Sequence, residues 1–249
     1  MLINPATNGP VSAVSRLIFA LDYPRLEDAR DMAVRLGERV GMLKIGLELF
    51  VEAGPDALAI ARDLGLPIFL DLKLHDIPET VERAVDRAAT LGASIVTVHA
   101  AGGAEMLRRA ARRAETTGVV TIAAVTVLTS LDEGDLGAQG IKGDVPEQTS
   151  RLAKIAFEQG VRAFVCSPQE VASMRATLGP EATLITPGVR PSDRAKDDQK
   201  RVATPGRAIA EGADYVVVGR PIRDATDPLV AADLIVKEIE AGVKKRSQP

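Results

Sequence analysis

Short apolar segments recur along the chain and alternate with longer segments of helical character. The apolar segments do not alternate with polar residues, which is typical of strands buried on both faces of a parallel sheet. The intervening segments are rich in Ala, Leu, Arg and Glu, as in 26–39, 104–116 and 147–159. The predicted strands are Leu17–Leu21, Met42–Ile45, Ile68–Leu72, Ile95–Val98, Thr121–Val127, Ala163–Cys166, Thr183–Thr186 and Tyr215–Val218.

Eight strands, each followed by a helix, predict a single α/β domain closed into a (β/α)8 TIM barrel. The length of 249 residues is typical of this fold, and 46% hydrophobic residues suffice for a large core. An open doubly wound sheet is the alternative, but no Gly-x-Gly-x-x-Gly motif follows the first strand. We expect one domain over residues 1–249, with 1–15 as a short N-terminal extension and 243–249 as a polar tail.

Composition removes several classes of function. The net charge is −3 with both signs scattered, so we expect no nucleic-acid partner. A single cysteine, Cys166, excludes an internal disulfide, and with only two histidines the chain has few soft metal ligands. The longest nearly apolar stretch, Val119–Leu128, is too short to cross a membrane, and the first sixteen residues are not a signal peptide. We expect a cytoplasmic protein.

The stretch Asp71–Thr80 combines charge with a change of structure. It follows the apolar run 66–70, and because side chains alternate along a strand, Asp71 and Lys73 should share a face. Buried charges are tolerated when they are paired or functional. Asp76 follows in a loop, and Pro78 begins the next helix. The stretch therefore predicts either an ion pair that closes a turn or a catalytic acid–base group.

Polar side chains also stand at the ends of the other predicted strands. In a barrel, these carboxyl ends surround one mouth, where the active site lies. Structural interpretations exist as well: Asp22 caps the first helix, Lys44 pairs with Asp71, and His99 is a core histidine with its hydrogen bonds satisfied, which is the favoured interpretation for that residue. Their common position favours an active site. The candidates are Asp22, Lys44, Asp71, Lys73, Asp76, His99, Thr129, Ser130, Pro187, Arg190, Gly219 and Arg220.

A phosphate site is predicted after the last two strands. Barrel enzymes often bind phosphate there, glycine permits close approach of a backbone N–H, and arginine supplies a fork of donors. Gly219 and Arg220 follow the eighth strand. The polar loop from Arg190 to Ala203, which contains Gln199, is either a solvated excursion or a lid over an anionic ligand. We favour the lid because its basic ends flank the phosphate site.

The sequence of residues 71–80, Asp-Leu-Lys-Leu-His-Asp-Ile-Pro-Glu-Thr, closely resembles the signature of the orotidine 5′-phosphate decarboxylase family. Glu79 stands where that family usually has asparagine. The Asp-x-Lys-x-x-Asp core is shared with 3-keto-gulonate-phosphate decarboxylase and hexulose-phosphate synthase, whereas the extension through Thr80, with Gln199 and Arg220, favours the orotidine family. Further similar segments occur in the family's order: Ala20–Asp22, Lys44–Gly46, Val98–Gly103, Leu128–Ser130, Pro187–Arg190 and Val218–Ile222.

The resemblance implies decarboxylation of orotidine 5′-monophosphate to uridine 5′-monophosphate, the last step of pyrimidine synthesis, without metal or organic cofactor. By similarity, Lys73 donates a proton to C6 of the pyrimidine, and Asp71 positions its ammonium. The other implied catalytic residues are Lys44 and Asp76. The implied substrate-binding residues are Asp22 and Lys44 for the ribose, Asp71 near the substrate carboxylate, Thr129 near the base, and Arg190, Gln199, Gly219 and Arg220 for the phosphate or the loop over it. Thr80, Ser130 and Pro187 complete the implied set.

The resemblance also implies a homodimer in which Asp76 and Thr80 cross to the partner's site. Two other functions remain open. A metal-dependent sugar-phosphate decarboxylase or aldolase of the same suprafamily would carry a carboxylate near Lys44, where a cation repels a metal. A non-catalytic nucleotide-binding barrel would usually have lost Lys73 or Asp71, and both are present.

Overall fold

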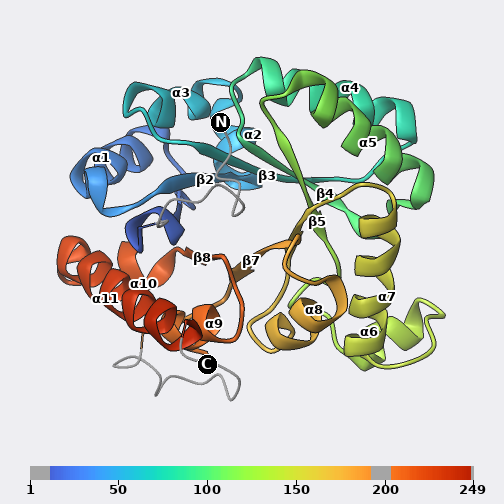
Figure 1. Ribbon diagram of the computed structural model, residues 1–249. Helices are drawn as coiled ribbons and strands as arrows, with labels where there is room; N and C mark the ends of the chain where they lie inside the picture. Colours follow the sequence, from blue (N-terminus) through green and yellow to red (C-terminus); the bar gives the residue numbers. More distant parts are fainter. Residues whose placement is uncertain (1–11, 192–202, 248–249) are drawn as a thin grey trace.

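The protein is a closed barrel of eight parallel strands surrounded by helices (Figure 1). The computed structural model describes residues 12–191 and 203–247. Each strand pairs with its neighbours in chain order, and β8 closes the barrel against β1. The predicted (β/α)8 fold is therefore confirmed. The strands are β1 Leu17–Ala20, β2 Met42–Gly46, β3 Ile68–Leu74, β4 Ile95–His99, β5 Thr121–Val125, β6 Ala163–Val165, β7 Thr183–Pro187 and β8 Tyr215–Val218.

The helices lie outside the barrel and differ in two respects from one helix per strand. Each of β2, β5 and β8 is followed by two helices, and residues 243–246 of the predicted polar tail form the last turn of α11. None of the described helices is both long and apolar enough to cross a membrane. The helices are α1 Leu26–Leu36, α2 Leu47–Ala53, α3 Asp56–Asp63, α4 Pro78–Thr90, α5 Ala104–Thr117, α6 Glu133–Ala138, α7 Val145–Glu158, α8 Val171–Leu178, α9 Pro205–Ala210, α10 Arg220–Arg223 and α11 Pro228–Arg246, with 3₁₀ turns η1 Val14–Arg16, η2 Gly37–Arg39 and η3 Ala100–Gly102.

Two apolar cores hold the barrel together. One lies between the sheet and the helices, and the other fills the barrel interior with side chains such as Ile18, Met42, Phe69 and Ile95. Because side chains alternate along each strand, the inward-facing position that follows this interior layer lies two residues further on, nearer the carboxyl end. The interior core therefore forms the floor on which the polar residues of the mouth stand.

At the opposite, amino-terminal end of the barrel, a buried carboxylate ties several segments together. Asp214 precedes β8 and accepts hydrogen bonds from Arg175 Nη2 at 2.6 Å and from the backbone N–H of Leu184 at 2.9 Å. Arg246 of α11 lies 3.4 Å from the other carboxylate oxygen. Arg16, just before β1, donates to the backbone oxygen of Asp214 at 3.0 Å. Polar clusters at this end of such barrels serve stability.

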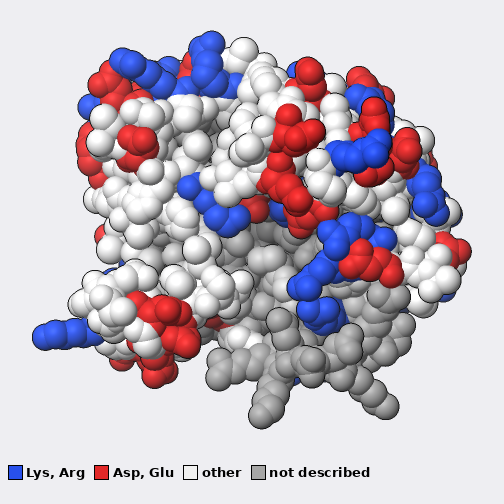
Figure 2. All heavy atoms as spheres, turned by 180° about the vertical axis from the view of Figure 1, so that it is seen from behind, with Lys and Arg blue, Asp and Glu red and all other residues white. Residues whose placement is uncertain are grey.

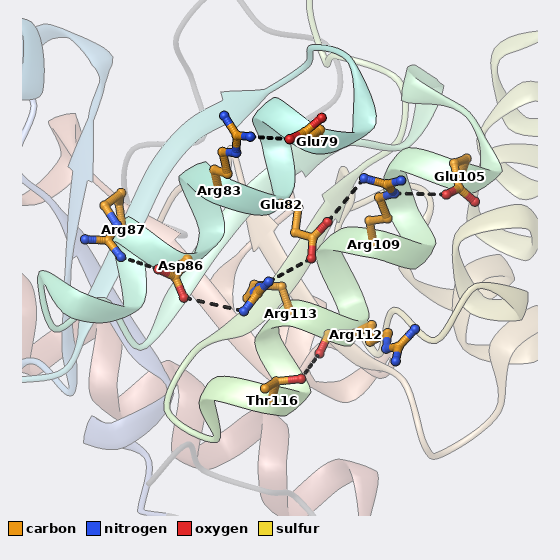
Figure 3. Close-up of polar contacts among 10 residues, drawn as sticks. All are labelled: Glu79, Glu82, Arg83, Asp86, Arg87, Glu105, Arg109, Arg112, Arg113 and Thr116. Atoms are coloured by element: carbon orange, nitrogen blue, oxygen red, sulfur yellow. Dashed lines mark hydrogen bonds and ion pairs between the residues drawn. The ribbon is translucent and has the colours of Figure 1, made fainter.

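Helices α4 and α5 pack side by side outside β3 and β4, and ion pairs join their outer faces (Figure 3). Glu82 of α4 accepts from Arg113 at 2.9 Å and from Arg109 at 3.4 Å. Seen from the side opposite to the view of Figure 1, the described part of the surface carries Lys and Arg next to Asp and Glu (Figure 2). Exposed pairs of this kind contribute only about 0–1 kcal/mol each. They help hold α4, whose first turn lies at the mouth.

We expect Asp214→Ala to lower the free energy of unfolding by about 3–5 kcal/mol, because it removes the counter-ion of the poorly exposed Arg175 guanidinium and leaves the buried backbone N–H of Leu184 without an acceptor. Urea denaturation measures this loss. Asp63→Ala is the matched control, since Asp63 is 59% exposed and pairs with Arg30 at 2.8 Å on the surface. Its loss should stay within about 1 kcal/mol. Equal losses in the two variants would contradict a stabilising role for the Asp214 cluster.

Candidate active site

Four charged side chains form a continuous line of alternating sign at the carboxyl-end mouth. Lys44 Nζ lies 3.0 Å from Asp22 Oδ1 and 3.7 Å from Asp71 Oδ2. Lys73 Nζ donates to both oxygens of Asp71 at 2.9 Å. The side chains of Lys44 and Asp71 are only 12% and 14% exposed. Each of these poorly solvated charges is therefore balanced by a neighbour of opposite sign.

The inward register of the strands delivers three of these groups. Asp22, Lys44 and Asp71 lie two residues beyond Ala20, Met42 and Phe69, which belong to the interior core. Their side chains therefore rise from the floor of the mouth on three consecutive strands or their ends. Gly46 continues the same register on β2, where an added Cβ would lie 3.0 Å from Lys44 Nζ and 3.3 Å from Asp22 Oδ1. The glycine leaves the room that the Lys44–Asp22 pair needs.

The fourth group, Lys73, is placed by an irregularity in β3. Leu70 pairs with Val96 and Leu74 pairs with Val98, so residues 71–73 all lie opposite Thr97. Lys73 has a φ of 51°, the one positive φ outside glycine in the described chain. Bulges re-aim side chains beside active sites, and a left-handed non-glycine backbone there is a recurrent sign of function. Simple alternation correctly predicted that Lys73 meets Asp71, but it did not predict the bulge.

Thr97 is a site residue that the sequence reasoning missed. Its hydroxyl donates to Asp71 Oδ1 at 3.0 Å and accepts from the backbone N–H of Lys73 at 2.8 Å. The side chain is fully buried. The available signal was a hydroxyl in the inward register of an otherwise apolar strand, because Thr97 lies two residues after Ile95 of the interior core.

The two histidines of the chain are neighbours at the mouth. The rings of His75 and His99 have centroids 5.3 Å apart. Burial lowers the pKa of His99, and the nearby His75 and the Lys73 ammonium lower it further. Neutral imidazole is therefore the main form of His99 at pH 7, and it adds no positive charge beside Lys73.

Other predicted site residues lie around the mouth without joining the charged line. Asp76 is exposed and accepts from the backbone N–H of Ile77 at 2.6 Å. Thr80 is exposed in the first turn of α4. Thr129 and Ser130 are exposed in the loop after β5. The structure therefore leaves these four side chains available at the surface.

The predicted phosphate residues follow β7 and β8. Pro187 is the last residue of β7. Arg190 is half-buried, and its backbone N–H donates to the backbone oxygen of Ala203 at 3.1 Å. This hydrogen bond joins the two ends of the loop from Arg190 to Ala203. Gln199 lies outside the described residues. Gly219 sits beside β1, since a Cβ there would lie 3.4 Å from that of Ala20. The last of the predicted phosphate residues, Arg220, is exposed at the start of α10.

The fold and the charges at its mouth define a (β/α)8-barrel protein with a preorganised lysine–aspartate line where barrel enzymes bind substrate. The model of the "Orotidine 5'-phosphate decarboxylase / HUMPS family" matches residues 15–235. The chain therefore belongs to this family.

Individual relatives agree with the family match. The orotidine 5'-phosphate decarboxylase of Anaeromyxobacter sp. (strain K) is 53% identical over 220 residues, which cover 88% of this chain and 96% of the relative. That of Thermobifida fusca (strain YX) is 52% identical over 224 residues, 89% of this chain and 94% of the relative. The crystal structure of the enzyme from Lactobacillus acidophilus has a TM-score of 0.80 at 37% identity and covers 90% of this chain and 99% of that one.

Proposed function

We propose that this protein decarboxylates orotidine 5′-monophosphate to uridine 5′-monophosphate and that Lys73 protonates C6. The two relatives that are 53% and 52% identical to this chain are named orotidine 5'-phosphate decarboxylase. The observation that supports the role of Lys73 is its ammonium, held at 2.9 Å by both oxygens of Asp71 inside the mouth. Loss of carbon dioxide leaves a carbanion at C6 with no π-system to absorb it. A fixed ammonium beside that atom stabilises the negative charge and then supplies the proton.

The remaining charges keep the Lys73 ammonium in place. Asp71 engages it through two oxygens, which restricts the direction of Nζ, and Lys44 neutralises Asp71 from the other side. The charges are ordered before the substrate arrives, so little reorganisation is needed as the negative charge develops. Catalysis by this arrangement depends on electrostatic preorganisation.

The substrate is bound by groups on opposite sides of the mouth. Asp22 and Lys44 hold the ribose hydroxyls, and residues after β5 contact the base. Phosphate binds after β7 and β8, where Gly219 leaves space beside β1. Binding energy from this remote group drives the chemistry at the ring. The proposed contact to the base comes from Thr129, and those to the phosphate and its loop come from Arg190, Gln199, Gly219 and Arg220. The other proposed substrate-binding residues are Asp71, Thr80, Ser130 and Pro187.

We also propose that the working form is a homodimer in which Asp76 and Thr80 complete the partner's site. Three large apolar side chains on the segments after β2 and β3 support this: Leu47 is 53% exposed, Val51 80% and Ile77 67%. Ile77 is next to Asp76, so an interface that covers it would also bury the carboxylate. Apolar groups at a functional rim mark an interaction surface.

The competing functions are less well supported. A metal-dependent sugar-phosphate enzyme needs carboxylates where Lys44 now places an ammonium 3.0 Å from Asp22 and 3.7 Å from Asp71. A non-catalytic barrel does not require the Lys73–Asp71 pair, whose geometry is intact. We place the activity in the single barrel domain. We also place the protein in the cytoplasm, because the chain has one cysteine and that thiol is buried, which fits a reducing compartment.

Purified protein should decarboxylate orotidine 5′-monophosphate at the same rate with and without excess EDTA. The ultraviolet absorbance of the substrate measures this rate. Lys73→Ala should retain well under about a tenth of the wild-type rate, because it removes both the proton donor and the stabilising charge. Lys154→Ala, on the exposed side of α7, is the control and should keep full activity. Activity that vanishes with EDTA and returns with magnesium would identify a metal-dependent enzyme instead.

Asp76→Ala and Lys73→Ala chains should each be nearly inactive, yet their mixture should regain activity. If Asp76 crosses the interface, a mixed dimer has one site with both lesions and one with neither. Random exchange makes half of the dimers mixed, so recovery should approach about a quarter of wild type. Subunit exchange is verified by mass spectrometry of tagged chains. Exchange without recovery would assign Asp76 to its own chain's site.

Arg220→Ala should strongly lower kcat/KM for the nucleotide and should hardly change kcat/KM for the nucleoside orotidine, which has no phosphate. A charge-assisted contact to phosphate contributes about 1.5–3 kcal/mol, roughly one to two decades in kcat/KM. Phosphite should activate the reaction of orotidine in wild type and less in the variant. Arg30→Ala, on the surface of α1, is the control and should leave both substrates unaffected. Equal slowing of nucleotide and nucleoside would remove Arg220 from the phosphate site.

A further inference from the structure

We infer that Thr97 is a positioning residue for Lys73: its buried hydroxyl fixes both the backbone from which the lysine projects and the carboxylate that its ammonium contacts. This inference rests on the proposed decarboxylase function. Thr97 is fully buried, so it acts through its neighbours and not on the substrate.

The first step concerns the backbone. Between the Leu70–Val96 and Leu74–Val98 pairs, β3 contributes residues 71–73 and β4 contributes Thr97 alone. The regular ladder therefore does not determine where these three residues lie. The backbone N–H of Lys73, the residue with a φ of 51°, donates to Thr97 Oγ1 at 2.8 Å. The side chain of β4 thus takes the place of a missing ladder acceptor at the most unusual backbone position in β3.

The second step concerns the counterion. The hydroxyl of Thr97 has one proton, and it donates that proton to Asp71 Oδ1 at 3.0 Å. A hydroxyl that accepts from one group and donates to the other fixes the distance between them. Asp71 in turn contacts Lys73 Nζ through both oxygens at 2.9 Å. Lys73 is therefore held at its backbone nitrogen and at its ammonium by a ring of contacts that closes through one hydroxyl.

The third step is the comparison with valine, which has nearly the same shape and no hydroxyl. Valine would leave the Lys73 N–H without its Thr97 acceptor and would remove the hydroxyl that donates to Asp71 Oδ1, while nearly keeping the volume of the buried side chain. The bulge then loses its tie to β4, and the ammonium moves from the place where the carbanion forms. Small misplacements of a reacting group are enough to lower the rate on the order of a hundredfold.

The test is Thr97→Val, assayed for kcat and KM with orotidine 5′-monophosphate and for binding of uridine 5′-monophosphate. We expect kcat to fall roughly ten- to a hundredfold, while KM and the Kd of the product change by less than about threefold. Thr97→Ser restores the hydroxyl and should recover kcat to within about threefold of wild type. Thr186→Val is the control: Thr186 is also a fully buried strand threonine, its hydroxyl lies 4.0 Å from Cys166 Sγ, and kcat should not change.

A valine variant with the kcat of wild type would overturn the inference, as would serine and valine variants that are equally slow. If the valine chain does not fold, the Thr97→Ser and Thr97→Ala pair repeats the comparison, and serine must exceed alanine at least about tenfold in kcat. Failure of the proposed function is a separate outcome, because wild-type protein would then leave orotidine 5′-monophosphate unchanged. Failure of the inference leaves wild-type turnover intact and removes only its dependence on the hydroxyl.

Discussion

The two-oxygen contact between Asp71 and Lys73 is the interaction on which the rest of the mouth depends. A carboxylate with so little exposure is stable only if positive charge and hydrogen-bond donors surround it. Lys44, Lys73 and the Thr97 hydroxyl supply them from three strands. The interior core beneath fixes the register of those strands, so the geometry of the charges follows from apolar packing lower in the barrel.

The fold was predictable because its signal is local. Each strand is a short apolar run, and the expected strands overlap all eight observed ones. The errors lie at boundaries. The strand expected to reach Val127 ends at Val125, although Thr126 and Val127 are still buried, because pairing and not burial ends the strand. The second helix is divided because Gly54 takes a φ of 54° and Pro55 follows.

The site was only partly predictable, and the division has a physical basis. Charges at strand ends follow from sequence once strands are known, so Asp22, Lys44 and Asp71 could be brought together in advance. The bulge at Lys73 is a property of two strands in register, and β4 is remote from it in sequence, so Thr97 could not be connected with Lys73. The roles proposed for Asp76 and Thr80 depend on a second chain, whose contacts cannot be derived from the strand pattern of one chain.

The barrel carries a charged cluster at each end, and the two clusters have different roles. The chain begins β8 from Asp214, tied to Arg175, and leaves it at Gly219 beside the mouth. Heritable changes at the two ends therefore divide into two kinds of allele. Those at the amino end remove contacts of the Asp214 cluster and so lower the free energy of unfolding. Those at the carboxyl end change the charges of the mouth and leave the packing of the interior core beneath it intact.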